Sequence, residues 1–226
     1  MSPFERIYQW AGGGVFVGAL AFCAYTFAFV WSKDGEFRAS ALVTDAILFT
    51  IFATHHSVFA RDAVKRRMAR VVPDRLLRST YVWIASLLLI GVCGFWQAIG
   101  GSVYDVGGWR AVAHAGVQLA GLGLIVGAVR KIDALELAGI REHSSGQPLQ
   151  ITGPYRLVRH PIYLGWFLAT FGPAHMTTDR LFFAGIAAAY LVIAMPIEER
   201  ALRRYFGDTY ARYAQHVRWR VVPYIY

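Results

Sequence analysis

The chain has 226 residues and a formal net charge of +9, and 56% of its residues are hydrophobic while only 16% are charged. This composition is far more apolar than that of an ordinary soluble domain, and it predicts an integral-membrane protein. Nucleic-acid binding is disfavoured as the reason for the positive charge, because the basic residues lie in the gaps between long apolar runs.

Six apolar runs predict the fold class, an all-α polytopic membrane bundle of about six transmembrane helices. The runs cover residues 10–31, 39–59, 80–99, 111–129, 161–176 and 181–197. A bilayer core of about 30 Å needs about 20 helical residues. The last two runs are shorter, so we expect them to form a short helical hairpin joined by residues 177–180. Five crossings result instead if the first run is peripheral.

The distribution of basic residues predicts the orientation in the membrane. With six crossings, 19 of the 23 lysines and arginines fall on one side and four on the other. The basic side holds residues 1–9, 60–79, 130–160 and 198–226. The positive-inside rule places both termini and these loops in the cytoplasm, as for a protein of the bacterial inner membrane.

The two cysteines predict neither a disulfide framework nor a structural zinc site. Cys23 and Cys93 both lie inside apolar runs, far from any Cys-x-x-Cys spacing. We expect them to be small buried residues, and the sequence predicts no metal site.

A basic turn stands at the start of the fifth apolar run, in residues 153–165 (GPYRLVRHPIYLG). Pro161 disfavours helical geometry at His160 and is itself suited to be the first residue of a helix. We expect the free amides of this helix start and the guanidinium of Arg159 to bind an anion. The alternative is that Arg159 and His160 contact lipid headgroups and that Tyr163 belongs to the interfacial aromatic belt.

Two adjacent acids, Glu198 and Glu199, follow the sixth run. If they pair with Arg203 and Arg204, they begin a solvated helix. In the other interpretation, one of them faces the protein and holds an ammonium group. Under that interpretation we expect Arg159 and Glu199 to face charged groups of a ligand and not each other.

The order and spacing of these motifs resemble those of the integral-membrane methyltransferases. Residues 153–213 read GPYRxxRHPIYxG, an apolar hairpin, and EExxLxxxFGxxYxxY, as in isoprenylcysteine carboxyl methyltransferase and the phospholipid N-methyltransferases. The resemblance implies that both motifs wrap S-adenosylmethionine, in a fold unrelated to that of soluble methyltransferases. It implies a cofactor pocket lined by Arg159, His160, Tyr163, Gly165, Glu198 and Glu199.

Upstream segments are most similar to the branch that holds the methanethiol S-methyltransferases and the NnrU-type proteins. These segments are 56–61 (HSVFAR), 78–82 (RSTYV) and 133–141 (DALELAGIR). We expect His56, Asp133 and Arg141 to form the catalytic, acceptor half of the site. The alternative is ordinary loop charge, with His56 paired to Asp45 as an interior polar group on the same stripe of the second run.

The sequence therefore predicts a single integral-membrane domain, residues 1–226, with a four-helix part (1–129) and a cofactor-binding part (130–226). Its expected activity is S-adenosylmethionine-dependent methylation of a small or lipophilic thiol, with membrane lipid as the other partner. Two alternative acceptors are a prenylcysteine-like carboxylate and a phospholipid amine. An NADPH-dependent membrane reductase and a non-catalytic membrane protein are the alternatives of another class.

Overall fold

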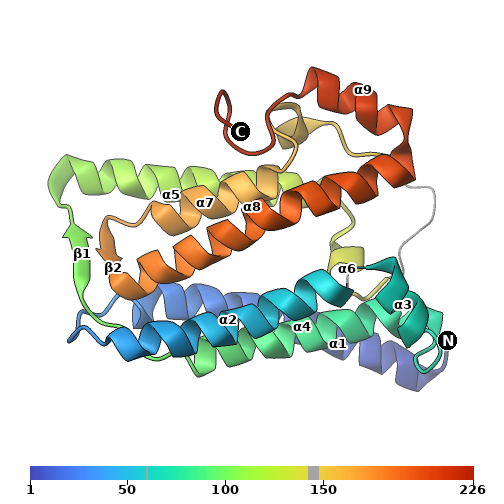
Figure 1. Ribbon diagram of the computed structural model, residues 1–226, viewed down its shortest axis with the longest axis horizontal. Helices are drawn as coiled ribbons and strands as arrows, with labels where there is room; N and C mark the ends of the chain where they lie inside the picture. Colours follow the sequence, from blue (N-terminus) through green and yellow to red (C-terminus); the bar gives the residue numbers. More distant parts are fainter. Residues whose placement is uncertain (60, 142–147) are drawn as a thin grey trace. The chain divides into compact units, whose positions relative to one another are not determined.

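The computed structural model describes residues 1–59, 61–141 and 148–226. The chain divides into two compact units, which are Met1–Gly101 with Ala134–Ser145, and Ser102–Asp133 with Gly146–Tyr226 (Figure 1). The functional division into residues 1–129 and 130–226 stays a prediction.

The regular secondary structure in the described residues of the first unit is helical. Its elements are α1 (Pro3–Tyr25), the π-helix η1 (Thr26–Val30), α2 (Ala39–Phe59), α3 (Asp62–Met68), α4 (Asp74–Gly94) and α6 (Ala134–Leu137). A capping box begins α1: the Ser2 hydroxyl accepts from the Glu5 amide at 3.2 Å, and the Glu5 carboxylate accepts from the Ser2 amide at 2.8 Å. Cys23 and Cys93 are buried and free, as predicted for small interior residues.

The described residues of the second unit combine four α-helices and one 3₁₀-helix with a two-stranded sheet. Its elements are β1 (Ser102–Asp105), α5 (Gly108–Val129), the 3₁₀-helix η2 (Gly153–Arg156), α7 (Pro161–Phe171), β2 (His175–Thr177), α8 (Thr178–Phe206) and α9 (Asp208–His216). The strands pair antiparallel, with Ser102 opposite Thr177 and Asp105 opposite His175. Since β1 leads into α5 and β2 into α8, the sheet brings the starts of these helices to the same end of the unit (Figure 1).

Two glycines allow α7 to pack closely on α5. A Cβ atom on Gly165 would lie 2.7 Å from the carbonyl oxygen of Gly121, and one on Gly121 would lie 2.6 Å from the carbonyl oxygen of Gly165. These distances are shorter than a carbon and an oxygen can approach without a shift of the backbone. The α5–α7 contact therefore requires glycine on both helices, and it fixes the position of the residues that precede α7.

Within residues 1–59, 61–141 and 148–226, five helices are long and apolar enough to cross a membrane, and they confirm the predicted polytopic helical fold. They are Pro3–Val30, Ala39–Phe59, Asp74–Gly94, Gly108–Val129 and Thr178–Phe206. The fifth predicted run differs, because α7 has only 11 residues, or about 16 Å of helix, roughly half of the hydrocarbon thickness. The Gly172-Pro173 pair ends it, and residues 175–177 continue as a strand.

The expectation that both final helices are short was wrong for α8. This helix has 29 residues and continues nine residues beyond the end of the sixth apolar run. Pro196 lies inside it, and the Glu, Arg, Ala and Leu residues that follow are strong helix formers. Glu198 and Glu199 therefore lie within α8 and do not begin a separate helix.

Candidate active site: a buried carboxylate on helix α8

Glu199 is the centre of the polar network in the second unit. Its side chain lies on α8 and is only 4% exposed. Arg159 Nε approaches Oε1 at 2.7 Å, and Arg220 Nε approaches Oε2 at 3.2 Å. His160 Nε2 lies 3.5 Å from Oε1. Two permanently cationic side chains and one imidazole thus surround a single buried carboxylate, which offsets the cost of removing it from water.

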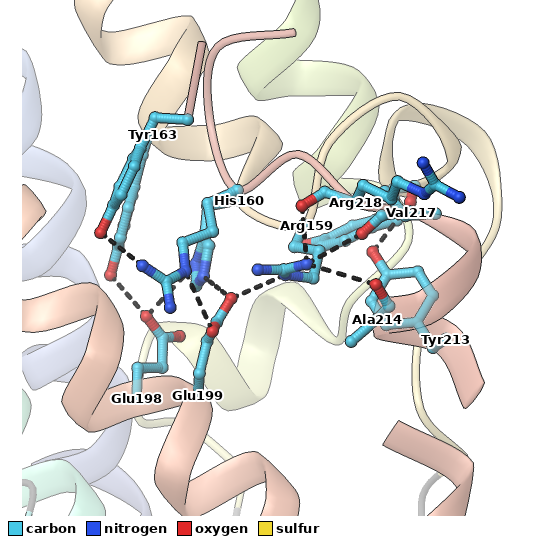
Figure 2. A network of polar contacts seen from close by, with 12 residues as sticks. Arg159, His160, Tyr163, Glu198, Glu199, Tyr213, Ala214, Val217 and Arg218 are labelled. Atoms are coloured by element: carbon cyan, nitrogen blue, oxygen red, sulfur yellow. Dashed lines mark hydrogen bonds and ion pairs between the residues drawn. The ribbon is translucent and has the colours of Figure 1, made fainter. Parts of the chain in front are cut away.

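The other end of Arg159 holds the segment that follows α9. Its Nη1 donates to the carbonyl oxygens of Val217 at 3.0 Å and Arg218 at 2.9 Å, with a longer contact of 3.4 Å to Ala214. Figure 2 shows Arg159 lying between Glu199 on one side and these carbonyls on the other. Nε and Nη1 of Arg159 are therefore engaged inside the unit, and the prediction that Arg159 and Glu199 do not face each other was wrong.

His160, Tyr163 and Glu198 form a more open face of the same network. The rings of His160 and Tyr163 stack at a centroid distance of 5.2 Å and an angle of 13°. The Tyr163 hydroxyl donates to Oε2 of Glu198 at 2.8 Å, and His160 Nδ1 lies 3.6 Å from the same oxygen. The Glu198 side chain is 47% exposed, against 4% for Glu199. Of the two acids, Glu198 is the one that an external ligand can reach.

The start of α7 has the backbone geometry that the sequence predicts, but it does not offer the expected set of free amides. His160 has a φ of −120° and Pro161 is the first helical residue. The amides of Tyr163 and Leu164 both donate to the His160 carbonyl oxygen at 3.1 Å. These two amides are consequently not available to an anion, so the set of free amides at this helix start is smaller than expected, and anion binding there stays a prediction.

Gly165 is buried in the contact between α7 and α5. Its backbone lies against Gly121 and Ile125, so helix packing alone explains why glycine occupies this position. A role for Gly165 in lining a cofactor pocket stays a prediction.

Sequence reasoning missed several members of the network. Arg220 contacts Glu199 from 21 positions away, with no local spacing that marks it as a partner. The hydroxyl of Tyr213 donates to the Tyr155 carbonyl oxygen at 2.8 Å and ties α9 to η2. Burial, followed by the charge of Glu199, raises the pKa of Tyr210 to about 12. Both tyrosines belong to the YxxY pattern after Glu199, which was the available signal for them.

The predicted acceptor residues are divided between the units. His56 and Arg141 belong to the first unit and Asp133 to the second. His56 lies near the end of α2, and its Nδ1 atom is 2.8 Å from the hydroxyl of Tyr81 on α4. On the same stripe, Asp45 is fully buried and accepts from the Gln97 amide at 2.8 Å. The shared catalytic role of His56, Asp133 and Arg141 stays a prediction.

No metal site is found in the part of the chain that the structure describes: no three His, Cys, Asp or Glu side chains gather there as a metal ion would require.

Comparison with known proteins identifies relatives over most of the chain. The chain is 35% identical over 185 residues to methanethiol S-methyltransferase 2 of Bradyrhizobium diazoefficiens, covering 78% of this chain and 71% of that protein. It is 34% identical to methanethiol S-methyltransferase of Mycobacterium tuberculosis, covering 78% and 76%. Nurim of Xenopus laevis is 29% identical, covering 71% and 63%. No protein-family model and no solved structure matches the chain.

The apolar helices and these relatives together define an integral-membrane methyltransferase. The chain belongs to the family of the methanethiol S-methyltransferases. Such an enzyme requires a methyl donor.

Proposed function

We propose that this protein transfers a methyl group from S-adenosylmethionine to a small thiol resembling methanethiol. Its relatives, the methanethiol S-methyltransferases, support the reaction class. The proposal names particular residues because side chains from the two sequence motifs, in residues 153–165 and 198–213, contact one another. Arg159 and Glu199 are 40 positions apart, Tyr163 and Glu198 are 35 apart, and all four join one network.

The open face of this network fits the positive end of the proposed cofactor. S-adenosylmethionine supplies a methyl group on a sulfonium centre, and it also carries an ammonium group. Glu198 presents a half-exposed carboxylate beside the ring of Tyr163. A carboxylate next to an aromatic face is suited to a cation. We therefore assign Glu198 and Tyr163 to direct contact with the cofactor.

Arg159 and Glu199 act in this proposal by positioning. Their ion pair joins α8 to the segment before α7, and the Arg159 amide donates to the Trp219 carbonyl oxygen at 2.9 Å. His160 touches both acids and stacks on Tyr163. The buried pair thereby holds the ring and the open carboxylate in one geometry, which is what an in-line displacement requires of the protein.

The acceptor half rests on the predicted residues His56, Asp133 and Arg141. A thiol reacts as its thiolate, so the protein must accept a proton or stabilise the negative sulfur. Imidazole and guanidinium groups provide these two functions. We propose these residues for the acceptor side, with Gly165 as a lining residue of the cofactor side.

A binding and transfer experiment tests the reaction class. The purified protein is titrated with S-adenosylmethionine and, separately, with NADPH, because a membrane reductase would bind the second. It is then incubated with S-adenosylmethionine labelled in the methyl group and a panel of small thiols, a prenylcysteine and an amino-phospholipid. We expect the label in the thiols. Binding of NADPH alone, or label only in the prenylcysteine or the lipid, would refute the proposed substrate class.

The location that we propose is the bacterial inner membrane, with both termini and the active site in the cytoplasm. The charge asymmetry supports it, and pairing of β1 with β2 is consistent with α5 and α8 starting on one side. Reporter fusions at Gly35, Gly108 and Thr178 should read as extracytoplasmic and a fusion at Tyr226 as cytoplasmic. A cytoplasmic reading at Gly108 or at Thr178 would refute this topology.

A further inference from the structure

A cationic groove lies on the second unit between η2 and the segment that follows α9. It has a volume of about 440 Å³ and is lined by Arg156, Leu157, His216, Arg218, Trp219 and Tyr224, among others. Of the lining residues that the structure describes, none is acidic. The volume falls within the range of small-ligand sites, about 300–1,000 Å³.

The backbone keeps the two sides of the groove together. Arg159 Nη1 donates to the carbonyl oxygens of Val217 and Arg218, and the His160 amide donates to the Arg220 carbonyl oxygen at 2.8 Å. Arg156 from η2 and Arg218 from the later segment therefore line one cavity although 62 positions separate them. Two like charges are brought to one place by contacts that involve neither guanidinium.

Neither the Arg156 nor the Arg218 guanidinium makes a hydrogen bond or ion pair with another described residue. Both side chains are exposed at the mouth of the groove. An anion bound in the groove would accept charge-assisted hydrogen bonds from these guanidinium groups. A phosphate group suits such paired guanidinium groups.

The surroundings of the groove indicate that the phosphate belongs to a lipid. Leu157 is 61% exposed, Tyr224 86% and Ile225 80%. The Trp219 and Tyr224 rings lie 5.4 Å apart. Exposed apolar side chains beside a tryptophan, a tyrosine and arginines are typical of the headgroup level of a membrane. A soluble phosphate would leave this apolar margin without a partner.

We propose that this groove binds one anionic phospholipid, with its phosphate between Arg156 and Arg218 and its glycerol and acyl region along Leu157, Trp219 and Tyr224. The site is separate from the Glu198–Glu199 network and does not depend on the proposed methyl transfer. Because Arg159 holds both the groove and Glu199, the lipid would be bound directly beside the positioning pair.

The test compares lipid binding by the full chain and two charge-matched double variants. One variant carries Arg156→Gln and Arg218→Gln. The control carries Arg200→Gln and Arg212→Gln, which removes the same charge from exposed positions of the same unit. Phosphatidylglycerol and phosphatidylcholine are titrated separately into detergent-solubilised protein, and bound lipid is counted by native mass spectrometry.

The intact protein should prefer phosphatidylglycerol. In the groove variant its affinity should fall by about 20- to 30-fold, since each arginine contributes a factor of about five at an anionic surface. The control should fall much less, and inorganic phosphate should not displace the lipid. Equal losses in both variants, equal binding of the two lipids, or displacement by inorganic phosphate would overturn the proposal.

A second measurement locates the lipid without relying on charge removal. Phosphatidylglycerol with brominated acyl chains should quench the fluorescence of Trp219 in nanodiscs more than brominated phosphatidylcholine does. The variant Trp219→Phe should lose this difference. If the difference persists in Trp219→Phe, the lipid lies elsewhere. If the lipid and S-adenosylmethionine compete, the groove belongs to the cofactor site. Either result would overturn the proposal.

Discussion

The guanidinium of Arg159 and the carboxylate of Glu199 form an ion pair across 2.7 Å, with side chains only 9% and 4% exposed. Each motif of the family thus provides one half of a buried salt bridge. Buried pairs of this kind are poor sources of net stability but are costly to break. We interpret the pair as the element that holds α8 against the start of α7, while the more exposed Glu198 remains available to a ligand.

Removing the Arg159 side chain should chiefly lower the stability of the fold, and its effect on cofactor binding should be secondary. The substitution Arg159→Ala leaves the Glu199 carboxylate buried without its closest cation, so we expect the free energy of unfolding to fall by about 3–5 kcal/mol. Chemical denaturation in detergent measures this change. Arg200→Ala on the exposed side of α8 is the control and should be nearly neutral. A stable Arg159→Ala protein that has lost only cofactor binding would support a ligand-facing Arg159.

In contrast to Arg159→Ala, Glu198→Gln should weaken cofactor binding while leaving the stability of the fold nearly unchanged. Glu198 is half exposed and accepts one hydrogen bond from Tyr163, so the fold should tolerate the change. Loss of a charge-assisted contact should weaken S-adenosylmethionine binding on the order of ten- to a hundredfold. Isothermal titration calorimetry measures the affinity, and Asp208→Asn at an exposed position of α9 provides a charge-matched control. Unchanged affinity in Glu198→Gln would remove this residue from the cofactor site.

Gly165→Ala tests whether this glycine is needed for helix packing. The new methyl group would meet the Gly121 carbonyl oxygen at 2.7 Å and the Ile125 side chain at 2.6 Å. Such overpacking should cost about 1–3 kcal/mol, seen as a lower melting temperature. Gly123→Ala on α5 is the control, since its new Cβ would have no neighbour within 4 Å. If both variants melt together, the α5–α7 contact is looser than described.

Substitution of the acceptor residues should separate turnover from cofactor affinity. We expect His56→Gln and Asp133→Asn to lower kcat while the dissociation constant for S-adenosylmethionine stays the same, as when catalytic positioning alone is lost. Tyr81→Phe, which removes the hydroxyl beside His56 Nδ1, should show a smaller effect of the same kind. Full activity in both His56→Gln and Asp133→Asn would confine the active site to the C-terminal third of the chain.

The features that the sequence predicts well are those with local causes. Pro161 favours the observed non-helical backbone at His160 and is itself the first residue of α7. A largely apolar run, with Asp45 inside it, predicts α2 with its observed bounds, Ala39–Phe59. The length of α8 was missed because hydropathy stops at residue 197, whereas helix propensity continues beyond it.

The sequence indicated which two motifs contribute charged residues to the polar network, but not which of those residues pair with each other. Opposite charges in two motifs indicate a polar site, yet the sequence alone cannot distinguish a pair that meets a ligand from a pair that meets itself. Arg159 precedes α7, whose close packing on α5 requires Gly121 and Gly165, and it meets Glu199 of α8 from 40 positions away. Arg220 joins them through a turn of the chain after α9 that has no periodic pattern.

The central claim is methyl transfer from S-adenosylmethionine to a small thiol at the Glu198 face of the network. The most direct measurement incubates the purified protein with S-adenosylmethionine deuterated in its methyl group and with methanethiol, and analyses the volatile product by mass spectrometry. The account predicts dimethyl sulfide carrying one labelled methyl group, formed at a much lower rate by Glu198→Gln than by Asp208→Asn. Absence of labelled dimethyl sulfide and of any other labelled thioether across the thiol panel, from protein that binds S-adenosylmethionine, would contradict it.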